Sequence, residues 1–120
     1  MLLNGGELDG IRLLSRKTVE LMTLNHLPSE LLSMKMGLRI LEGIGYGLGV
    51  GVMMKPARFG EIGSSGTIFW PGMFGTFFWV DPQEALIGLI LTQFDPGTYN
   101  PITRDIYCAG DASPDISSCC

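Results

Sequence analysis

Regularly spaced apolar residues predict one helix in the first third of this 120-residue chain. From Ser15 to about residue 25, apolar side chains recur on one helical face, and serine favours the N-cap position. Leu27-Pro28 ends the helix, because the residue before a proline is pushed out of helical geometry. Residues 29–41 mix helical and alternating spacing, so we expect irregular structure there with a short helical turn.

Alternating and continuous apolar runs predict strands in the second half. Residues 45–52 (GYGLGVGV) alternate glycine with an apolar residue, which predicts a strand whose bare face lies beneath something bulky. Residues 67–71 and 76–81 form an aromatic pair, and residues 86–93 form an apolar strand, with short links that favour an antiparallel meander. We expect an α/β fold, more narrowly α+β, with a three-stranded antiparallel meander, one packed helix and an irregular or disordered tail at 94–120.

Two turn signals occupy the first ten residues. Residues 1–6 are typical of the last turn of a helix and its glycine stop, which predicts that the chain begins inside a longer domain. Asp9-Gly10 is a favoured tip for a short hairpin. A hairpin is therefore expected at residues 7–10.

Composition excludes two classes of partner. The formal net charge is −4 and the 8 basic residues are scattered, so no basic stripe is present to bind nucleic acid. The longest apolar run, residues 85–91, is far shorter than the roughly 20 residues that cross a bilayer, so we expect no membrane span. The length indicates at most one domain.

Cysteine and histidine usage indicates no metal site, and we expect no cofactor. The 3 cysteines are Cys108, Cys119 and Cys120, and an odd count with two adjacent residues is not a disulfide framework. His26 is far from them in the sequence, whereas a metal site needs ligands at characteristic spacing. We interpret His26 as a surface or capping residue.

The aromatic run at residues 69–82 (FWPGMFGTFFWVDP) is the most informative segment, because it holds both tryptophans and four of the six phenylalanines. The glycines at 72 and 75 let backbone approach something closely, which is either a substrate or another strand. Trp79 and Tyr46 are expected to be packing residues. Trp70 fits a pocket wall and a packing core equally well.

A search for a complete catalytic set finds none. The chain has one histidine and no serine in a recognisable nucleophile setting, so it carries no triad. Residues 63–66 (GSSG) approach a nucleophile elbow in composition but not in spacing, and the glycines at 43–51 lack the Gly-Lys-Ser/Thr end of a phosphate loop. Asp81 and Glu84 flank a turn, where we expect a solvated surface role. The residues alone give no nucleophile.

Several segments nevertheless follow one another in a specific order. They are residues 2–10 (LLNGGELDG), 14–19 (LSRKTV), 45–49 (GYGLG), 70–72 (WPG) and 75–93, which ends in LTQ. Together they resemble the C-terminal part of serine hydrolases of the β-lactamase superfamily, most closely the esterases and penicillin-binding-protein-like enzymes related to class C β-lactamases. That family uses a Ser with a Lys three positions later, assisted by a Tyr-x-Asn element. Neither motif occurs in this sequence.

The resemblance implies a substrate-binding role for the turn at 70–73. Trp70-Pro71-Gly72 occupies the position of the family's Lys/His/Trp-x-Gly triplet, on the strand that edges the active site. Trp70 would line the acyl pocket, Gly72 would let substrate approach the strand, and the Met73 N–H would be one of two oxyanion-hole donors. Pro71 stands where this branch more often has Gly, Ser or Thr. It offers no hydroxyl to a substrate carboxylate, which argues against β-lactam recognition.

The resemblance implies a partial β-lactamase-like fold at residues 1–93 that contributes the oxyanion-side strand of a serine hydrolase. The intact enzyme would form an acyl-enzyme with a small ester or amide substrate and hydrolyse it with water, and we expect this chain alone to be inactive. The alternative is a non-catalytic binding or assembly module built on a small antiparallel sheet. In that case residues 86–91 would support self-association through an exposed sheet edge.

Overall fold

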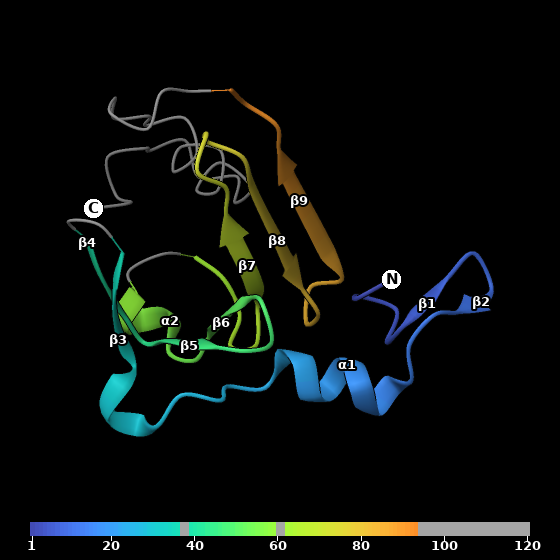
Figure 1. Cartoon of the computed structure of the whole chain (residues 1–120), viewed down its shortest axis with the longest axis horizontal. Helices are drawn as coiled ribbons and strands as arrows, with labels where there is room; N and C mark the ends of the chain where they lie inside the picture. Colours follow the sequence, from blue (N-terminus) through green and yellow to red (C-terminus); the bar gives the residue numbers. More distant parts are fainter. Residues whose placement is uncertain (37–38, 60–61, 94–120) are drawn as a thin grey trace.

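One antiparallel sheet forms the body of the fold. The computed structural model describes residues 1–36, 39–59 and 62–93. In this part of the chain, five strands lie in the order β5-β6-β7-β8-β9, and each pairs antiparallel with the next (Figure 1). The prediction of an α+β fold with an antiparallel meander is confirmed, but the sheet has five strands and not three. The strands are β5 (Ile44–Tyr46), β6 (Gly51–Met53), β7 (Ile68–Pro71), β8 (Phe77–Asp81) and β9 (Leu86–Ile90).

Shorter elements surround this sheet. They are β1 (Glu7–Leu8), β2 (Ile11–Arg12), α1 (Arg16–Thr23), the 3₁₀ turn η1 (Ser29–Leu31), β3 (Ser33–Met36), β4 (Arg39–Glu42) and α2 (Pro56–Phe59). β1 pairs with β2 and β3 pairs with β4, so each pair is a separate two-stranded hairpin. No helix among the described residues has the length and apolar character needed to cross a membrane. The predicted irregular tail at 94–120, with its three cysteines, lies outside the described residues.

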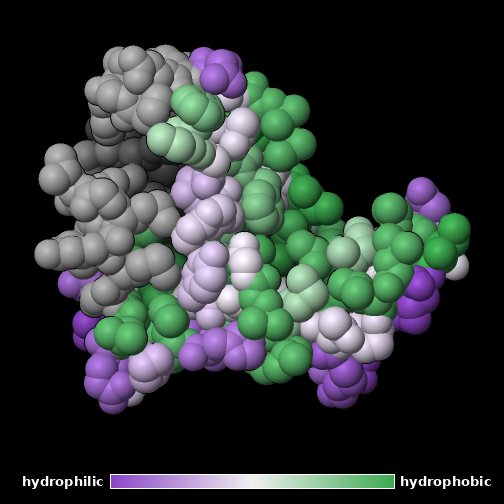
Figure 2. Space-filling view, in the orientation of Figure 1, coloured by the Kyte–Doolittle hydropathy of each residue, from purple (hydrophilic) through white to green (hydrophobic). Residues whose placement is uncertain are grey.

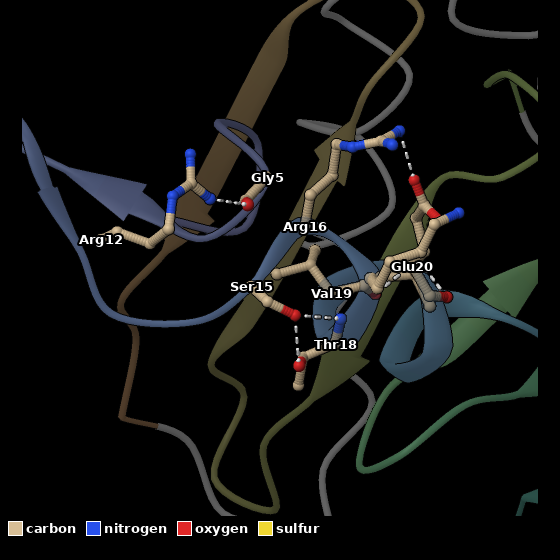
Figure 3. Close-up of polar contacts among 9 residues, drawn as sticks. Gly5, Arg12, Ser15, Arg16, Thr18, Val19 and Glu20 are labelled. Carbon is tan, nitrogen blue, oxygen red and sulfur yellow. Dashed lines mark hydrogen bonds and ion pairs between the residues drawn. The ribbon is translucent and has the colours of Figure 1, made fainter.

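Helix α1 begins where the sequence predicts. The Ser15 Oγ accepts a hydrogen bond from the Thr18 N–H at 3.0 Å, and thereby satisfies one of the free donors at the helix start (Figure 3). Val19 is the buried residue of the helix. The Arg16–Glu20 ion pair, with 2.7 Å between Nη1 and Oε1, lies on the exposed side, where such pairs contribute little stability.

The hairpin of β1 and β2 has the predicted tip. Asp9 and Gly10 both adopt positive φ, 51° and 78°, as a two-residue type I′ turn requires. The Arg12 Nη1 donates to the Gly5 carbonyl at 3.2 Å, which ties the hairpin back to the first turn of the chain (Figure 3).

The prediction of one strand over residues 45–52 is wrong. The segment folds into two short strands, β5 and β6, joined by a tight turn in which the Gly47 N–H donates to the Val50 carbonyl at 2.8 Å. Gly49 has a φ of 88°, a left-handed conformation that glycine adopts without strain. The alternation of glycine and apolar residues continues through the turn, so period two alone could not reveal the reversal.

The prediction of irregular structure over residues 29–41 holds only for its first part. The short helical turn is present as η1, but β3 and β4 follow it as an antiparallel hairpin with Met34 opposite Leu41. In β3 and β4 the alternating spacing of apolar residues therefore predicts the structure better than the helical spacing does.

One face of the five-stranded sheet carries a row of aromatic rings, and we call it the Phe69 face. Neighbouring ring centroids along the row lie 5.8 to 6.0 Å apart. The rings pack against a buried cluster of Leu41, Ile44 and Met53, so the prediction that Trp79 is a packing residue is confirmed. The row consists of Phe59 from α2, Phe69 from β7, and Phe77 and Trp79 from β8.

Two glycines on the Phe69 face make room for these rings. A Cβ on Gly88 would lie 2.0 Å from the Trp79 ring, and a Cβ on Gly51 would lie 3.3 Å from the Phe69 ring. The register places each glycine directly opposite the residue whose ring covers it. The expectation of a bulky neighbour over bare glycine is thus confirmed at Gly51.

The opposite face, which we call the Trp70 face, is only partly covered. Its buried cluster consists of Val50, Val52, Ile68 and Val80, and the leucines at positions 2 and 3 pack against it together with Phe78. Strand β9 adds Ile87 and Leu89 to this face, because they pair with Val80 and Phe78. These two residues are 57% and 63% exposed, so the Trp70 face is buried at β6 and β7 but exposed to solvent at β9.

Asp81 corrects another expectation, because it is buried and not solvated, with 4% of its surface exposed. Its carboxylate accepts hydrogen bonds from the N–H groups of Ser64, Gln83 and Glu84 and from the Thr67 hydroxyl, at 2.9–3.2 Å. Burial alone would raise the pKa of Asp81, but the bonds from Ser64, Glu84, Thr67 and Gln83 outweigh it and lower the pKa. One carboxylate therefore joins the loop before β7 to the turn after β8.

This arrangement predicts an acid-sensitive fold. Because the pKa of Asp81 in the folded chain lies below the ordinary value of about 3.9, the ionised carboxylate stabilises the fold above that pH. Its contribution disappears as the pH falls through the lowered pKa. Asp81→Asn should lower the free energy of unfolding at pH 7 by about 1–3 kcal/mol and flatten its decline between about pH 5 and pH 2.

Urea denaturation at a series of pH values measures this effect. Glu84→Gln is the matched control, because the side chain of Glu84 is exposed in the same turn. An Asp81→Asn variant that keeps the acid dependence of the wild type would show that the carboxylate is not the stabilising group.

Candidate functional site

The turn between β7 and β8 is held in a defined shape. The Gly72 N–H donates to the Thr76 carbonyl at 2.7 Å, and the Gly75 N–H donates to the Gly72 carbonyl at 3.2 Å. From beyond β9, the Thr92 hydroxyl donates to the Gly75 carbonyl at 2.6 Å. Four residues thus fix the turn that the sequence singled out. Sequence reasoning did not assign this role to two of them, Thr76 and Thr92.

Trp70 stands at the start of this turn with Tyr46 against it. The two ring centroids are 4.9 Å apart and the ring planes meet at 71°, an edge-to-face contact between β7 and β5. Both side chains are half-buried. The prediction that Tyr46 is a packing residue is confirmed, because its ring packs against Trp70. Part of the Trp70 ring remains exposed to solvent.

Strand β7 is locally an edge at Trp70 and Pro71. Its pairing with β6 ends at Phe69, whereas its pairing with β8 continues to Pro71, which lies opposite Phe77. No β6 residue therefore needs an N–H from Pro71, and a proline fits here although β7 is in the middle of the sheet. The missing length of β6 leaves one side of the turn accessible.

The four residues predicted to bind substrate, Trp70, Pro71, Gly72 and Met73, lie together at this open side. The Met73 side chain is 76% exposed. Within the described part of the chain, the Met73 N–H has no hydrogen-bond partner. A backbone donor of this kind, at an accessible turn, is available to a ligand oxygen.

Asn25 positions the outer edge of β5 behind Tyr46. Its Oδ1 accepts from the N–H groups of Tyr46 and Leu27, at 3.1 and 3.0 Å, and its Nδ2 donates to the Leu27 carbonyl at 2.9 Å. A Cβ on Gly45 would collide with this side chain. Sequence reasoning missed Asn25, although an asparagine between a helix end and a proline is a typical turn signal.

His26 is a capping residue, as predicted. Its Nε2 lies 2.8 Å from the Leu21 carbonyl at the end of α1, and its N–H donates to the Tyr46 carbonyl at 2.8 Å. Among the described residues, the hydrogen bond of the ring is thus to a backbone carbonyl and not to a serine. Across the ranges that the structure describes, no three His, Cys, Asp or Glu side chains are grouped so that they could hold a metal ion.

Residues 70–76 carry aromatic and backbone groups but no titratable side chain. They present the half-buried Trp70 ring and, within the described residues, a Met73 N–H without a partner. Asp81, whose pKa is lowered, lies at the end of β8 that is far from this turn. Bond cleavage at this turn would need a nucleophile and a proton acceptor from elsewhere.

Comparison with known proteins places the fold among hydrolases. No family model matches the chain. Over 101 residues, 80% of its length, it is 40% identical to the uncharacterized protein MT1414 and to protein Rv1367c, both of Mycobacterium tuberculosis. It covers 25% of each, so the chain spans about a quarter of the length of the curated relatives that it matches.

The likeness to a hydrolase comes from a solved structure. The chain superimposes on EstCE1, described as a hydrolase with promiscuous acyltransferase activity, with a TM-score of 0.60 and 27% sequence identity. The match covers 75% of this chain and 21% of EstCE1. The chain therefore has a hydrolase-like α+β fold.

The contact between Tyr46 and Trp70 predicts a measurable effect. Tyr46→Ala should lower the free energy of unfolding by about 2 kcal/mol and expose Trp70, because the ring that covers one of its sides is lost. Acrylamide quenching of tryptophan fluorescence, measured in a Trp79→Phe background, reports Trp70 alone. Tyr46→Phe is the control, since it keeps the edge-to-face contact. Equal quenching in all three proteins would contradict the contact.

Proposed function

We propose that this chain forms the oxyanion-side wall of the active site of a serine hydrolase related to the β-lactamase superfamily and similar to its esterases. The observation that carries the proposal is the likeness to EstCE1 over 75% of the chain. The ordered sequence segments that resemble this superfamily support it independently. The substrate class is a small ester or amide.

Trp70 would form the acyl side of the pocket. Its ring is half-buried and held edge-to-face by Tyr46, so it offers an apolar surface that is rigid before substrate arrives. Gly72 is required by the turn itself, because a Cβ there would collide with the Thr76 hydroxyl. The rigid aromatic surface of Trp70 supports substrate binding along the end of β7.

The Met73 N–H would stabilise the oxyanion of the tetrahedral intermediate. It has no partner within the described residues, and it lies inside the turn that is fixed by the Gly72–Thr76 hydrogen bond. A donor that needs no rearrangement is the kind that lowers the barrier of acyl transfer, typically by about 3 kcal/mol. Pro71 cannot add a hydroxyl contact to a substrate carboxylate, so esters are favoured over β-lactams.

The nucleophile would come from outside these 120 residues. The sequence contains no Ser-x-x-Lys and no Tyr-x-Asn, and the serines at 64 and 65 lie in the loop that is bound to Asp81 and Gln83. We infer that the chain alone forms no acyl-enzyme. The alternative of a non-catalytic assembly module is favoured by a different observation, the exposed edge strand β9.

A fluorophosphonate probe tests this proposal. The purified chain should show neither labelling nor a burst of p-nitrophenol from a p-nitrophenyl ester, because no activated serine is present. EstCE1, treated in the same way, is the positive control for probe and ester. Stoichiometric labelling of the chain, mapped to Ser64 or Ser65 by mass spectrometry and lost in the Ser→Ala variant, would contradict it.

A further inference from the structure

The open part of the Trp70 face lies in the same cross-strand rows as the candidate site. One row runs Trp70–Phe78–Leu89 from β7 through β8 to β9, and the next runs Ile68–Val80–Ile87. In the second row the first two side chains are 1% and 5% exposed, whereas Ile87 is 57% exposed. The face thus passes from core to open surface within two strands.

This open surface is continuous and uncharged. Leu89 is 63% exposed, and Leu91, just beyond the strand, is 75% exposed. Figure 2 shows apolar residues gathered over β9 and continuing towards the β1–β2 hairpin, where Leu8 and Ile11 are exposed as well. Single exposed leucines are ordinary, but adjacent ones on one sheet face indicate a surface that is covered in use.

Strand β9 has no feature that would keep another chain away. Among the described residues it is at the end of the sheet, and its sequence, LIGLI, contains no charge and no proline. Natural edge strands usually carry such residues when they remain solvent-exposed. Their absence indicates that something regularly lies against this end of the sheet.

The length of the relatives indicates what that is. Since the 101 matched residues make up 25% of each Mycobacterium tuberculosis relative, about 300 residues of each have no counterpart here. EstCE1 likewise has its larger part outside the match. A polypeptide of that size, folded against the same surface, has enough apolar area to cover two rows of a sheet.

We propose that the Trp70 face, at Ile87 and Leu89, is the docking surface for the remaining three-quarters of such a hydrolase. This inference rests on the proposed function and deepens it. The docked polypeptide would lie on the face that carries Trp70, in the rows next to the turn. Docking would therefore both complete the core and bring a nucleophile to the open side of the turn.

Co-expression tests the docking surface. The partner is Rv1367c from which the matched 101 residues have been deleted, and the 120-residue chain carries an affinity tag. We expect the wild-type chain to capture this partner and the Ile87→Glu/Leu89→Glu double variant to capture at least tenfold less. Because both side chains are exposed in the free chain, its circular dichroism should not change.

Two exposed leucines outside the surface serve as matched controls. Leu31→Glu lies in η1, and Leu86→Gln lies on β9 but on the Phe69 face, where it places no charge opposite Asp81. Both variants should capture as well as wild type. Absence of capture, or equal capture by the double variant, would overturn the proposal. Concentration-dependent dimers of the wild-type chain that the double variant abolishes would overturn it too, because a second copy would then cover the surface.

Capture without ester hydrolysis would support docking and count against the proposed function. The failure of one proposal can therefore be distinguished from the failure of the other.

Intact Rv1367c gives a second measurement that does not depend on the folding of a truncated protein. Glutamate at the positions aligned with Ile87 and Leu89 should lower its Tm by about 4 °C or more, because these positions are covered there. The same two substitutions should leave the Tm of the 120-residue chain within about 1 °C of wild type. Equal effects in both proteins would contradict the proposal.

Discussion

The close packing of aromatic rings onto glycines is the constraint on which the rest of this structure depends. Trp79 lies across Gly88 and Phe69 lies across Gly51, so rings cover both glycines on one face of the sheet and leave little room for a side chain at either position. Because side chains alternate along a strand, this arrangement commits the neighbours of those residues to the other face. Trp70, Phe78 and Leu89 consequently share the second face, and a one-residue change of register would exchange the two sets. The packed rings stabilise the sheet, and the other face is exposed at Ile87 and Leu89.

The candidate site follows from where pairing stops. β6 is paired with β7 at only two positions, so the end of β7 is an edge inside a sheet, and Pro71 is accommodated there without loss of a hydrogen bond. The turn beyond it is fixed by hydrogen bonds from Gly72, Gly75 and Thr92, which leave the Met73 N–H free within the described residues. This geometry supports the proposed oxyanion role, because the backbone donor is fixed in position without a protein partner among the described residues.

Local rules predicted the parts of this fold in which neighbours in sequence decide the structure. Ser15 caps α1, Asp9-Gly10 forms the first hairpin tip, and the aromatic strands on either side of Gly72 pair as expected.

The rest of the fold depended on contacts between residues that are distant in the sequence. The GYGLG segment turns because Gly45 and Gly47 pack against Asn25 and the Met22 carbonyl, neither of which its own pattern contains. Asp81 is buried because donors 14 to 17 residues away meet its carboxylate, whereas an acidic residue before a turn is usually solvated. The four residues of the candidate site were reached through resemblance to a family, and the open edge and the free N–H that support them could come only from the register.

The central claim, that this turn faces the reacting oxygen of an acyl-transfer site, is tested most directly in an intact relative. A crystal structure of Rv1367c after reaction with a fluorophosphonate would locate the phosphonyl oxygen. The account predicts that this oxygen lies about 3 Å from the backbone nitrogen of the residue aligned with Met73, with the residue aligned with Trp70 against the alkyl group. An adduct whose oxygen is held elsewhere, with the aligned turn buried in the core or far from the modified serine, would contradict it.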